Sequence, residues 1–320
     1  MPSPVQKQRI RPPALRPGDT VGVIAPAGLI TEESLHLGLA ALERRGYRPF
    51  HLPGILDREL YFAGSAQRRI EELHSMFANP EVKGIVCFRG GYSSNYLLPH
   101  IDLELIRNHP KFFCGCSDIT TLLTYFCDRA GLAVFHGPML QKDAKLDGID
   151  EQSWLAAATG SRWDREFGPE VQTLVAGTAD GTMYGGCLSL LCASLGTPYE
   201  IDTRGTILFL EDVAEPAYRI DRMLMQLKLA GKFDEVRGII FGEMLDCARG
   251  AEGYTLPEVV LRIVGDLGVP VVYGLRSGHV SRLNLTLPLG VAAHLHAAAR
   301  VALRIDAAVL AEPAPVPISR

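Results

Sequence analysis

The chain has 320 residues, 47% of them apolar and 21% charged, which suits a globular protein with enough core for two domains. A net charge of -4 gives no basic surface for nucleic acid or an anionic membrane, and neither a secretory signal nor a membrane-spanning run is expected. Seven cysteines, most within apolar runs, favour reduced thiols in the cytoplasm over a disulfide framework.

The first half of the chain alternates strand-like and helix-like segments. Apolar runs predict buried strands at 20–28, 82–88, 111–115 and 132–138. Helical spacing predicts helices at 31–46, at 65–80 and from Ile119 onward, with Thr31 as a possible N-cap of the first. This alternation predicts an N-terminal doubly wound parallel-sheet domain, over residues 1–145.

The alternation stops between about residues 142 and 172, where the sequence is polar and weakly helical at best. We interpret residues 146–172 as an interdomain connection and residues 173–320 as the C-terminal domain. This second domain combines three predicted helices with buried strands, and its end alternates as short antiparallel strands do. The fold class is therefore α/β, with a β-rich C-terminal α/β domain.

Ser117 lies where the short buried strand 111–115 gives way to a helix. Serine is a preferred N-cap, which stabilises a helix by about 1 kcal/mol over alanine. Ligands of open parallel sheets also bind at the carboxyl ends of strands, so Ser117 is a candidate nucleophile. Both interpretations stay open, and the backbone N–H of Asp118 is the nearest candidate for stabilising an oxyanion.

A serine nucleophile needs a base, and two of the nine histidines are candidates. His136 ends a strand of the first domain, where it could equally be a buried histidine bonded to the backbone. His279 lies in a loop that follows a buried strand and is flanked by glycine and serine. Loops after strands commonly carry such residues.

The carboxylate that orients the base has two neighbouring candidates. The apolar run 207–210 of a predicted strand leads into Glu211 and Asp212. Either acid could instead stabilise a helix N-terminus or pair with Arg219 or Arg222.

Two further motifs bear on ligand binding and on metal binding. Gly90 and Gly91 follow a buried strand and could turn backbone N–H groups toward a ligand, or simply form a tight turn. They lack the spacing of a phosphate loop. A lone C-x-C pair at Cys114 and Cys116, without a second pair or an H-E-x-x-H motif, predicts no metal and no other cofactor.

Several motifs occur in a fixed order along the chain: APAG, FRGGYSSNYLLPHID, GCSDITTL, FHGPM, LSLLCASLGTPYEID, ILFLEDVAEPAYRIDRMLMQL and GHVSRLNLTLPLG. Together they resemble the LD-carboxypeptidase family of serine peptidases, which includes the microcin C immunity peptidases. The resemblance runs from about residue 15 to 305. It differs from the family at Cys116, where an aromatic residue is common, and at residues 280–282.

The resemblance implies a catalytic triad of Ser117, Glu211 and His279. It also implies an oxyanion hole formed by the backbone N–H of Asp118 and of Gly91, with Gly90 as the alternative to Gly91. Members of the family cut peptide bonds without a metal and are commonly homodimers.

The function that this resemblance implies is hydrolysis of the L,D-amide bond to terminal D-alanine in muropeptides, during cell-wall recycling in the cytoplasm. An alternative within the family is hydrolysis of aminoacyl- or peptidyl-nucleotides, with Trp154 or Trp163 stacking on the base. Packing of both tryptophans at the domain interface is favoured over stacking. A catalytically silent ligand-binding protein is the third possibility, which the complete triad set disfavours.

Overall fold

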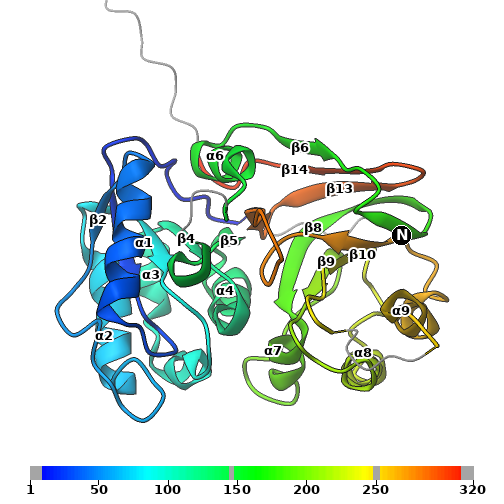
Figure 1. Cartoon of the computed structure of the whole chain (residues 1–320), viewed down its shortest axis with the longest axis horizontal. Coiled ribbons are helices and arrows are strands. Elements are labelled where there is room, and N and C mark those ends of the chain that lie inside the picture. The colour runs from blue at the N-terminus through cyan, green and yellow to red at the C-terminus, as the bar shows by residue number, and fades with distance from the viewer. Residues whose placement is uncertain (1–8, 144–147, 248–252, 311–320) are drawn as a thin grey trace, which may run out of the picture.

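The computed structural model describes residues 9–143, 148–247 and 253–310. Two sheets dominate it, one in each half of the molecule (Figure 1). The first has six strands in the order β12-β5-β4-β3-β1-β2, and the second has eight in the order β6-β14-β13-β8-β9-β10-β11-β7. Both halves contain α-helices, so the predicted α/β class is confirmed.

The N-terminal sheet is parallel through its first five strands. These are β1 (Thr20–Ile24), β2 (Arg48–Phe50), β3 (Val82–Cys87), β4 (Phe112–Gly115) and β5 (Val134–His136). Helices connect them: α1 (Glu32–Arg44), α2 (Ala66–Ala78), α3 (Leu103–Asn108) and α4 (Thr120–Tyr125). The predicted alternation is thus confirmed, including Thr31 as the N-cap of α1.

One strand of this sheet comes from the other end of the chain. Strand β12 (Leu287–Leu289) pairs antiparallel with β5, so that Leu287 lies opposite His136. The sequence pattern predicted antiparallel strands here but not their sheet, because three apolar residues carry no information about their partner.

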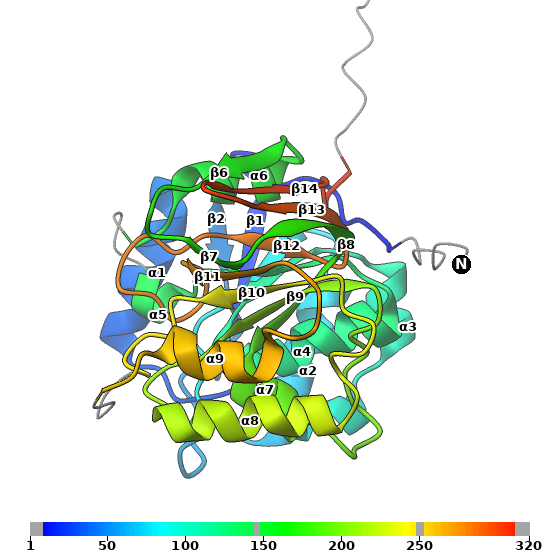
Figure 2. The same ribbon diagram turned by 90° about the vertical axis from the view of Figure 1, so that its right-hand side faces the viewer.

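The C-terminal sheet is built around the long strand β8 (Gly177–Cys187). Parallel neighbours follow on one side: β9 (Thr206–Glu211), β10 (Gly238–Gly242) and β11 (Val271–Leu275). Antiparallel strands complete the sheet: β6 (Trp163–Glu166), β7 (Gln172–Val175), β13 (Ala292–Ala297) and β14 (Val301–Ile305). Helices α7 (Leu188–Ala193), α8 (Ala217–Leu229) and α9 (Leu256–Val264) lie together on one side of it (Figure 2).

The segment expected to be weakly helical at best contains helix α6 (Glu151–Thr159) and strand β6, so the expectation of little regular structure is wrong. Helix α5 (Leu140–Asp143) precedes this segment, and helix α6 begins at Asp150, whose side chain accepts the Ser153 N–H. Trp154 is buried and packs its ring edge-on against Phe112 of β4. The rest of the buried side of α6 is made of small residues, which explains why the helical pattern was weak in the sequence.

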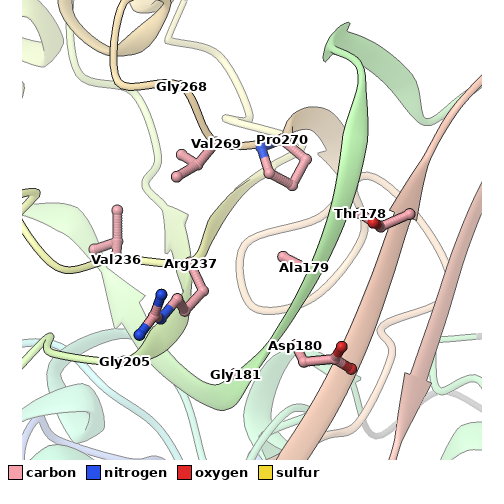
Figure 3. Close-up of a pocket in the computed structure, with 10 residues that line it drawn as sticks. All are labelled: Thr178, Ala179, Asp180, Gly181, Gly205, Val236, Arg237, Gly268, Val269 and Pro270. Atoms are coloured by element: carbon pink, nitrogen blue, oxygen red, sulfur yellow. The ribbon is translucent and has the colours of Figure 1, made fainter. Parts of the chain in front are cut away.

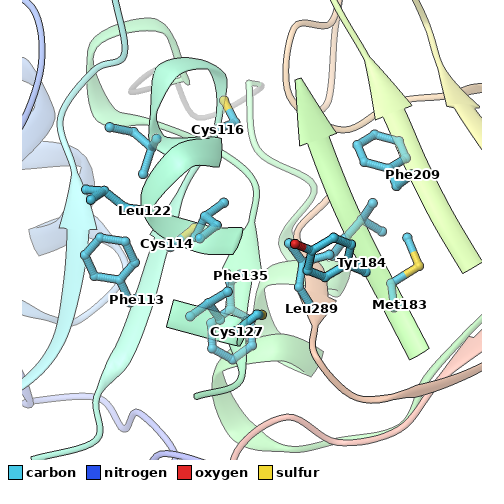
Figure 4. Packing of buried hydrophobic residues seen from close by; sticks show 14 of the residues in the cluster. Phe113, Cys114, Cys116, Leu122, Cys127, Phe135, Met183, Tyr184, Phe209 and Leu289 are labelled. Atoms are coloured by element: carbon cyan, nitrogen blue, oxygen red, sulfur yellow. The ribbon is translucent and has the colours of Figure 1, made fainter. Parts of the chain in front are cut away.

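Apolar side chains from both halves pack directly against one another. Phe135 of β5, Leu289 of β12, Tyr184 of β8 and Phe209 of β9 lie in one buried cluster (Figure 4). The two sheets therefore share a core, and the site described next lies where they meet. No helix among the described residues is long and apolar enough to cross a membrane.

Candidate active site

Ser117 occupies a tight turn between β4 and α4. It is the first residue of a 3₁₀ turn (Ser117–Ile119), and its φ of 60° lies in the left-handed region. That conformation costs a residue with a Cβ about 1–2 kcal/mol. The cap position belongs to Cys116, which makes no side-chain cap bond, so the expectation that Ser117 is an N-cap is wrong. The turn instead leaves Ser117 partly exposed between two buried neighbours.

The glycine loop after β3 lies directly against this turn. A Cβ on Gly90 would be 2.7 Å from the Cβ of Ser117, 2.9 Å from its Oγ and 3.2 Å from the backbone nitrogen of Asp118. The next residue, Gly91, has a φ of 118°, which favours glycine. The Gly90–Gly91 peptide is therefore beside the serine, which keeps both glycines as candidates for the second oxyanion donor.

Asp118 ties the same loop to the serine turn through its own side chain. Its carboxylate accepts the backbone N–H of Ser94 at 2.8 Å, and the Ser94 hydroxyl donates to the Asp118 carbonyl at 2.6 Å. Burial raises the pKa of Asp118, against the opposing effect of the hydrogen bonds from Ser94 and Ser93. The side chain of Asp118 thus has a structural role, and only its backbone N–H is a candidate oxyanion donor.

Glu211 and His279 form a close pair at the ends of two strands. The fully buried Glu211 ends β9, and its Oε2 accepts both the backbone N–H and the Nδ1–H of His279, each at 2.9 Å. Burial raises the pKa of Glu211, but His279 and His136 outweigh it and hold the pKa well below its usual range. An ionised carboxylate that accepts the Nδ1 hydrogen fixes the tautomer in which the Nε2 of His279 carries the lone pair of a base.

The loop that carries His279 follows β11 and is held by hydrogen bonds of the Asn284 side chain. The side chain of Asn284 accepts the Gly278 N–H at 2.9 Å and donates to the Gly278 carbonyl at 3.0 Å. Gly278 has a φ of 89°, and a Cβ there would lie 2.6 Å from the Cδ of Glu211. Glycine at this position lets the loop bring His279 onto the carboxylate.

Asp212, the acid next to Glu211 in the sequence, binds backbone groups instead of a histidine. Its Oδ2 accepts the Ser189 N–H and its Oδ1 accepts the Val213 N–H, both at 2.9 Å. Stabilisation of a helix start, left open for either acid, is thus found at Asp212, which contacts the first turn of α7. Glu211 does not pair with Arg219, which instead bonds Glu215.

The serine turn and the glutamate–histidine pair meet through β8. Thr120, one turn after Ser117, accepts the backbone N–H of Cys187 at 3.0 Å. Cys187 in turn lies opposite Glu211 in the parallel pairing of β8 with β9. The serine turn is thus linked through the end of β8 to the end of β9, where Glu211 contacts His279.

Two residues of this site were not assigned to it from the sequence. Cys187 offers a sulfur within 4.8 Å of ligating atoms of Glu211 and His279, a group that could hold a metal ion. The only sequence signal was its place at the strand end after two glycines. His136, the other candidate base, is buried beside Glu211, with its Nε2 3.7 Å from Oε1.

A pocket lies elsewhere in the described structure. It measures about 630 Å³ and is lined by the start of β8 and by loops that include Arg237 and Pro270 (Figure 3). Its residues Thr178 and Ala179 are at the opposite end of β8 from Cys187, which at about 3.3 Å per residue separates them by roughly 25–30 Å. A second hollow of about 330 Å³ lies between α4 and α7, with Thr121 and Leu190 among its lining residues.

Two α/β halves that meet at a serine turn and a buried glutamate–histidine pair define a serine-peptidase type of enzyme. Residues 21–137 match the model of the LD-carboxypeptidase N-terminal domain, and residues 180–295 match that of the C-terminal domain. The chain belongs to the LD-carboxypeptidase family.

Relatives named as carboxypeptidases match nearly the whole chain. It is 39% identical to the probable murein peptide carboxypeptidase of Bacillus subtilis, over 93% of this chain and 95% of that protein. It is 33% identical to the murein tetrapeptide carboxypeptidase of Pseudomonas aeruginosa, over 86% and 92%.

Solved structures show the same fold. The muramoyltetrapeptide carboxypeptidase of Oxalobacter formigenes superposes with a TM-score of 0.82 at 29% identity, covering 91% of this chain and all of that one. MccF in complex with glutamyl sulfamoyl guanosine superposes with a TM-score of 0.85 at 25% identity, covering 94% and 99%.

Proposed function

We propose that this enzyme hydrolyses the L,D-amide bond to the terminal D-alanine of muropeptides, using Ser117, His279 and Glu211 as a triad. The observation that carries the proposal is the pair of 2.9 Å hydrogen bonds from His279 to the Oε2 of Glu211. The left-handed turn of Ser117 supports it. The murein carboxypeptidases among the relatives support the substrate class.

In the proposed mechanism, the Nε2 of His279 takes the hydroxyl proton of Ser117 as Oγ attacks the amide carbonyl carbon. The resulting oxyanion accepts the backbone N–H groups of Asp118 and Gly91, with Gly90 as the alternative to Gly91. His279 then gives its proton to the nitrogen of the departing D-alanine, and a water activated by the same base releases the acyl group. Glu211 stabilises the imidazolium and fixes its tautomer.

The proposal extends to the setting of the enzyme. All seven cysteines are buried and none forms a disulfide within the described residues, which fits the cytoplasm. We also propose a homodimer that works without a metal. Sedimentation or light scattering of the full chain tests the dimer, and localisation of the native protein by fractionation tests the compartment.

The second candidate is hydrolysis of aminoacyl- or peptidyl-nucleotides, because MccF structures with bound sulfamoyl nucleosides share the fold. Trp154 and Trp163 do not support it as stacking residues. Both are 2% exposed; Trp154 packs on Phe112, and the indole N–H of Trp163 donates to the Thr286 carbonyl at 2.9 Å. This favours the packing role for both tryptophans and the muropeptide as substrate.

The deciding experiment compares the purified enzyme on a muropeptide tetrapeptide and on an aminoacyl-sulfamoyl nucleotide. We expect faster release of D-alanine from the tetrapeptide, and a loss of several orders of magnitude in kcat for Ser117→Ala. Ser161→Ala, an exposed loop serine, is the matched control. More than a tenth of native activity in Ser117→Ala would contradict the nucleophile, and failure of the wild type to label with a fluorophosphonate probe would favour a silent binding protein.

A further inference from the structure

His136 is the second histidine at Glu211, and the proposed mechanism does not use it. Its ring is fully buried at the end of β5. Its Nε2 lies 3.7 Å from the Oε1 of Glu211, on the carboxylate oxygen that His279 does not contact. Within the described part of the chain, neither of these two buried atoms has a hydrogen-bond partner.

The hydrogen atoms around the ring can be placed from its other nitrogen. Nδ1 lies 3.0 Å from the hydroxyl oxygen of Ser277, which itself lies 2.9 Å from the carbonyl of Leu285. The single hydroxyl hydrogen goes either to Nδ1 or to that carbonyl. If Nδ1 carried the only ring hydrogen, the lone pair of Nε2 would face the ionised Glu211 in a buried site, which is unfavourable. A hydrogen on Nε2 resolves this in either arrangement.

The packing leaves the ring little freedom to turn away from the carboxylate. A Cβ on Gly278 would lie 2.7 Å from Cε1 of His136, so the loop backbone closes over one side of the ring. The ring of Phe209 meets it edge-on, with centroids 5.2 Å apart. A shift of roughly 0.5–0.8 Å would bring Nε2 within hydrogen-bond distance of Oε1.

We propose that His136 is a positioning residue that donates its Nε2–H to Oε1 of Glu211, so that Oε2 stays directed at His279. Glu211 would then be held between two histidines, one on each oxygen. This inference rests on the proposed triad, because it assigns His136 a part in orienting the triad's acid. His136 itself would touch neither the substrate nor the reacting atoms.

Two substitutions of His136 distinguish the role of Nε2 from that of Nδ1. The amide nitrogen of glutamine can reach the place of Nε2 and still donate to Glu211, whereas that of asparagine reaches only the place of Nδ1, beside Ser277. We expect His136→Asn to lower kcat about 10–100-fold with KM within about twofold, as loss of an orienting partner commonly does. His136→Gln should keep kcat within about fivefold of the wild type. Equal losses in both variants, or full activity of His136→Asn, would overturn the proposal.

Two readouts do not depend on the substrate. The rate at which a fluorophosphonate probe labels Ser117 should fall in His136→Asn and recover in His136→Gln. If the wild type labels but releases no D-alanine, the proposed substrate fails while the labelling rates still test His136. Nitrogen-15 NMR of the wild type gives the tautomer of His136 directly. This measurement tests the proposal even if a variant does not fold. An Nε2 of His136 without a hydrogen would overturn the proposal.

Discussion

The hydroxyl oxygen of Thr120 accepts the backbone N–H of Cys187 at 3.0 Å, and this bond joins the two halves of the molecule at the active site. Thr120 lies one turn beyond Ser117, and Cys187 lies beside Glu211 in the neighbouring strand. Both residues are buried, and Gly186 makes room for the contact, since a Cβ there would lie 2.6 Å from the Thr120 hydroxyl. Thr120 is thus a direct link between the serine turn and the strand end beside Glu211.

Thr120→Val keeps the shape of the side chain but removes the acceptor. The buried N–H of Cys187 would then lack a partner, at a cost of about 1–3 kcal/mol in the free energy of unfolding. We expect kcat to fall along with stability, because the serine turn loses its attachment to β8. Urea unfolding and D-alanine release measure the two effects. Thr121→Val, the next residue of α4, is the control, and equal results for both variants would contradict the role of Thr120.

Glu211→Gln and Asp212→Asn should separate the two adjacent acids. Glutamine can still accept from His279 but cannot stabilise the imidazolium, so we expect a large fall in kcat with the fold retained. Asp212→Asn should change kcat much less, because Asp212 contacts the backbone of Ser189 and Val213 rather than a histidine. Steady-state kinetics and circular dichroism test the pair. A greater loss of kcat in Asp212→Asn would reverse the assignment.

Gly90→Ala should reduce activity by displacing the serine. The added methyl would stand 2.7 Å from the Cβ of Ser117, closer than such atoms approach, so the loop or the turn must move. We expect kcat to fall at least tenfold, since small misplacements of reacting groups are costly. Gly131→Ala is the control: its φ of 68° makes alanine strained, but there is open space around it. That variant should lose about 1 kcal/mol of stability and keep its kcat.

Asp128 should make the stability of the protein fall as the pH rises. Burial raises the pKa of Asp128 to about 6, although the Tyr184 hydroxyl and Arg9 oppose it. The folded state therefore binds its proton more tightly than the unfolded state, whose pKa is about 4. The resulting stabilisation is complete below about pH 4 and is lost as the pH rises through about 6, an effect of about 3 kcal/mol.

Asp128→Asn tests this relationship, because asparagine can still accept the Tyr184 hydroxyl, which donates to Asp128 at 2.6 Å. Urea unfolding at pH 4 and pH 7 should show a smaller fall in the free energy of unfolding for the variant than for the wild type. The exposed Asp234→Asn serves as the control. An unchanged or larger fall in Asp128→Asn would show that the carboxyl is not the titrating group.

Activity should survive dialysis against EDTA, because the proposed proton transfers need only Ser117, His279 and Glu211. D-alanine release is compared before and after chelation, and again after zinc is added. Loss of activity that zinc restores would contradict the metal-free mechanism. It would direct attention to the group of Cys187, Glu211 and His279, whose ligating atoms lie within 4.8 Å of one another.

The order of strands and helices could be predicted because apolar periodicity is a local signal. The runs around β1, β3, β4, β9 and β10 are buried, and the helix after Ser117 buries the predicted apolar side. Helix α6 was missed because its buried side consists largely of small residues. The sheet to which β12 belongs was missed because pairing over 150 residues leaves no local trace in the sequence.

The site residues could be proposed from residue type and place, but their contacts could not. Strand ends indicated Ser117, Glu211 and His279, whereas the left-handed backbone of Ser117 depends on the loop of Gly90 that lies against it. The sequence left His136 and His279 as competitors for one task. The structure places both beside one carboxylate, a relationship that arises only when β5, β9 and the loop after β11 come together.

The crossing of β12 into the N-terminal sheet bears on how this protein can be divided. Leu287, Pro288 and Leu289 cover the edge of β5, although they follow the serine turn by more than half of the chain. A fragment ending near residue 145 would expose that edge, which invites aggregation between copies. The two segments matched by the family models are thus not separable pieces, and we expect the chain to unfold in one cooperative transition.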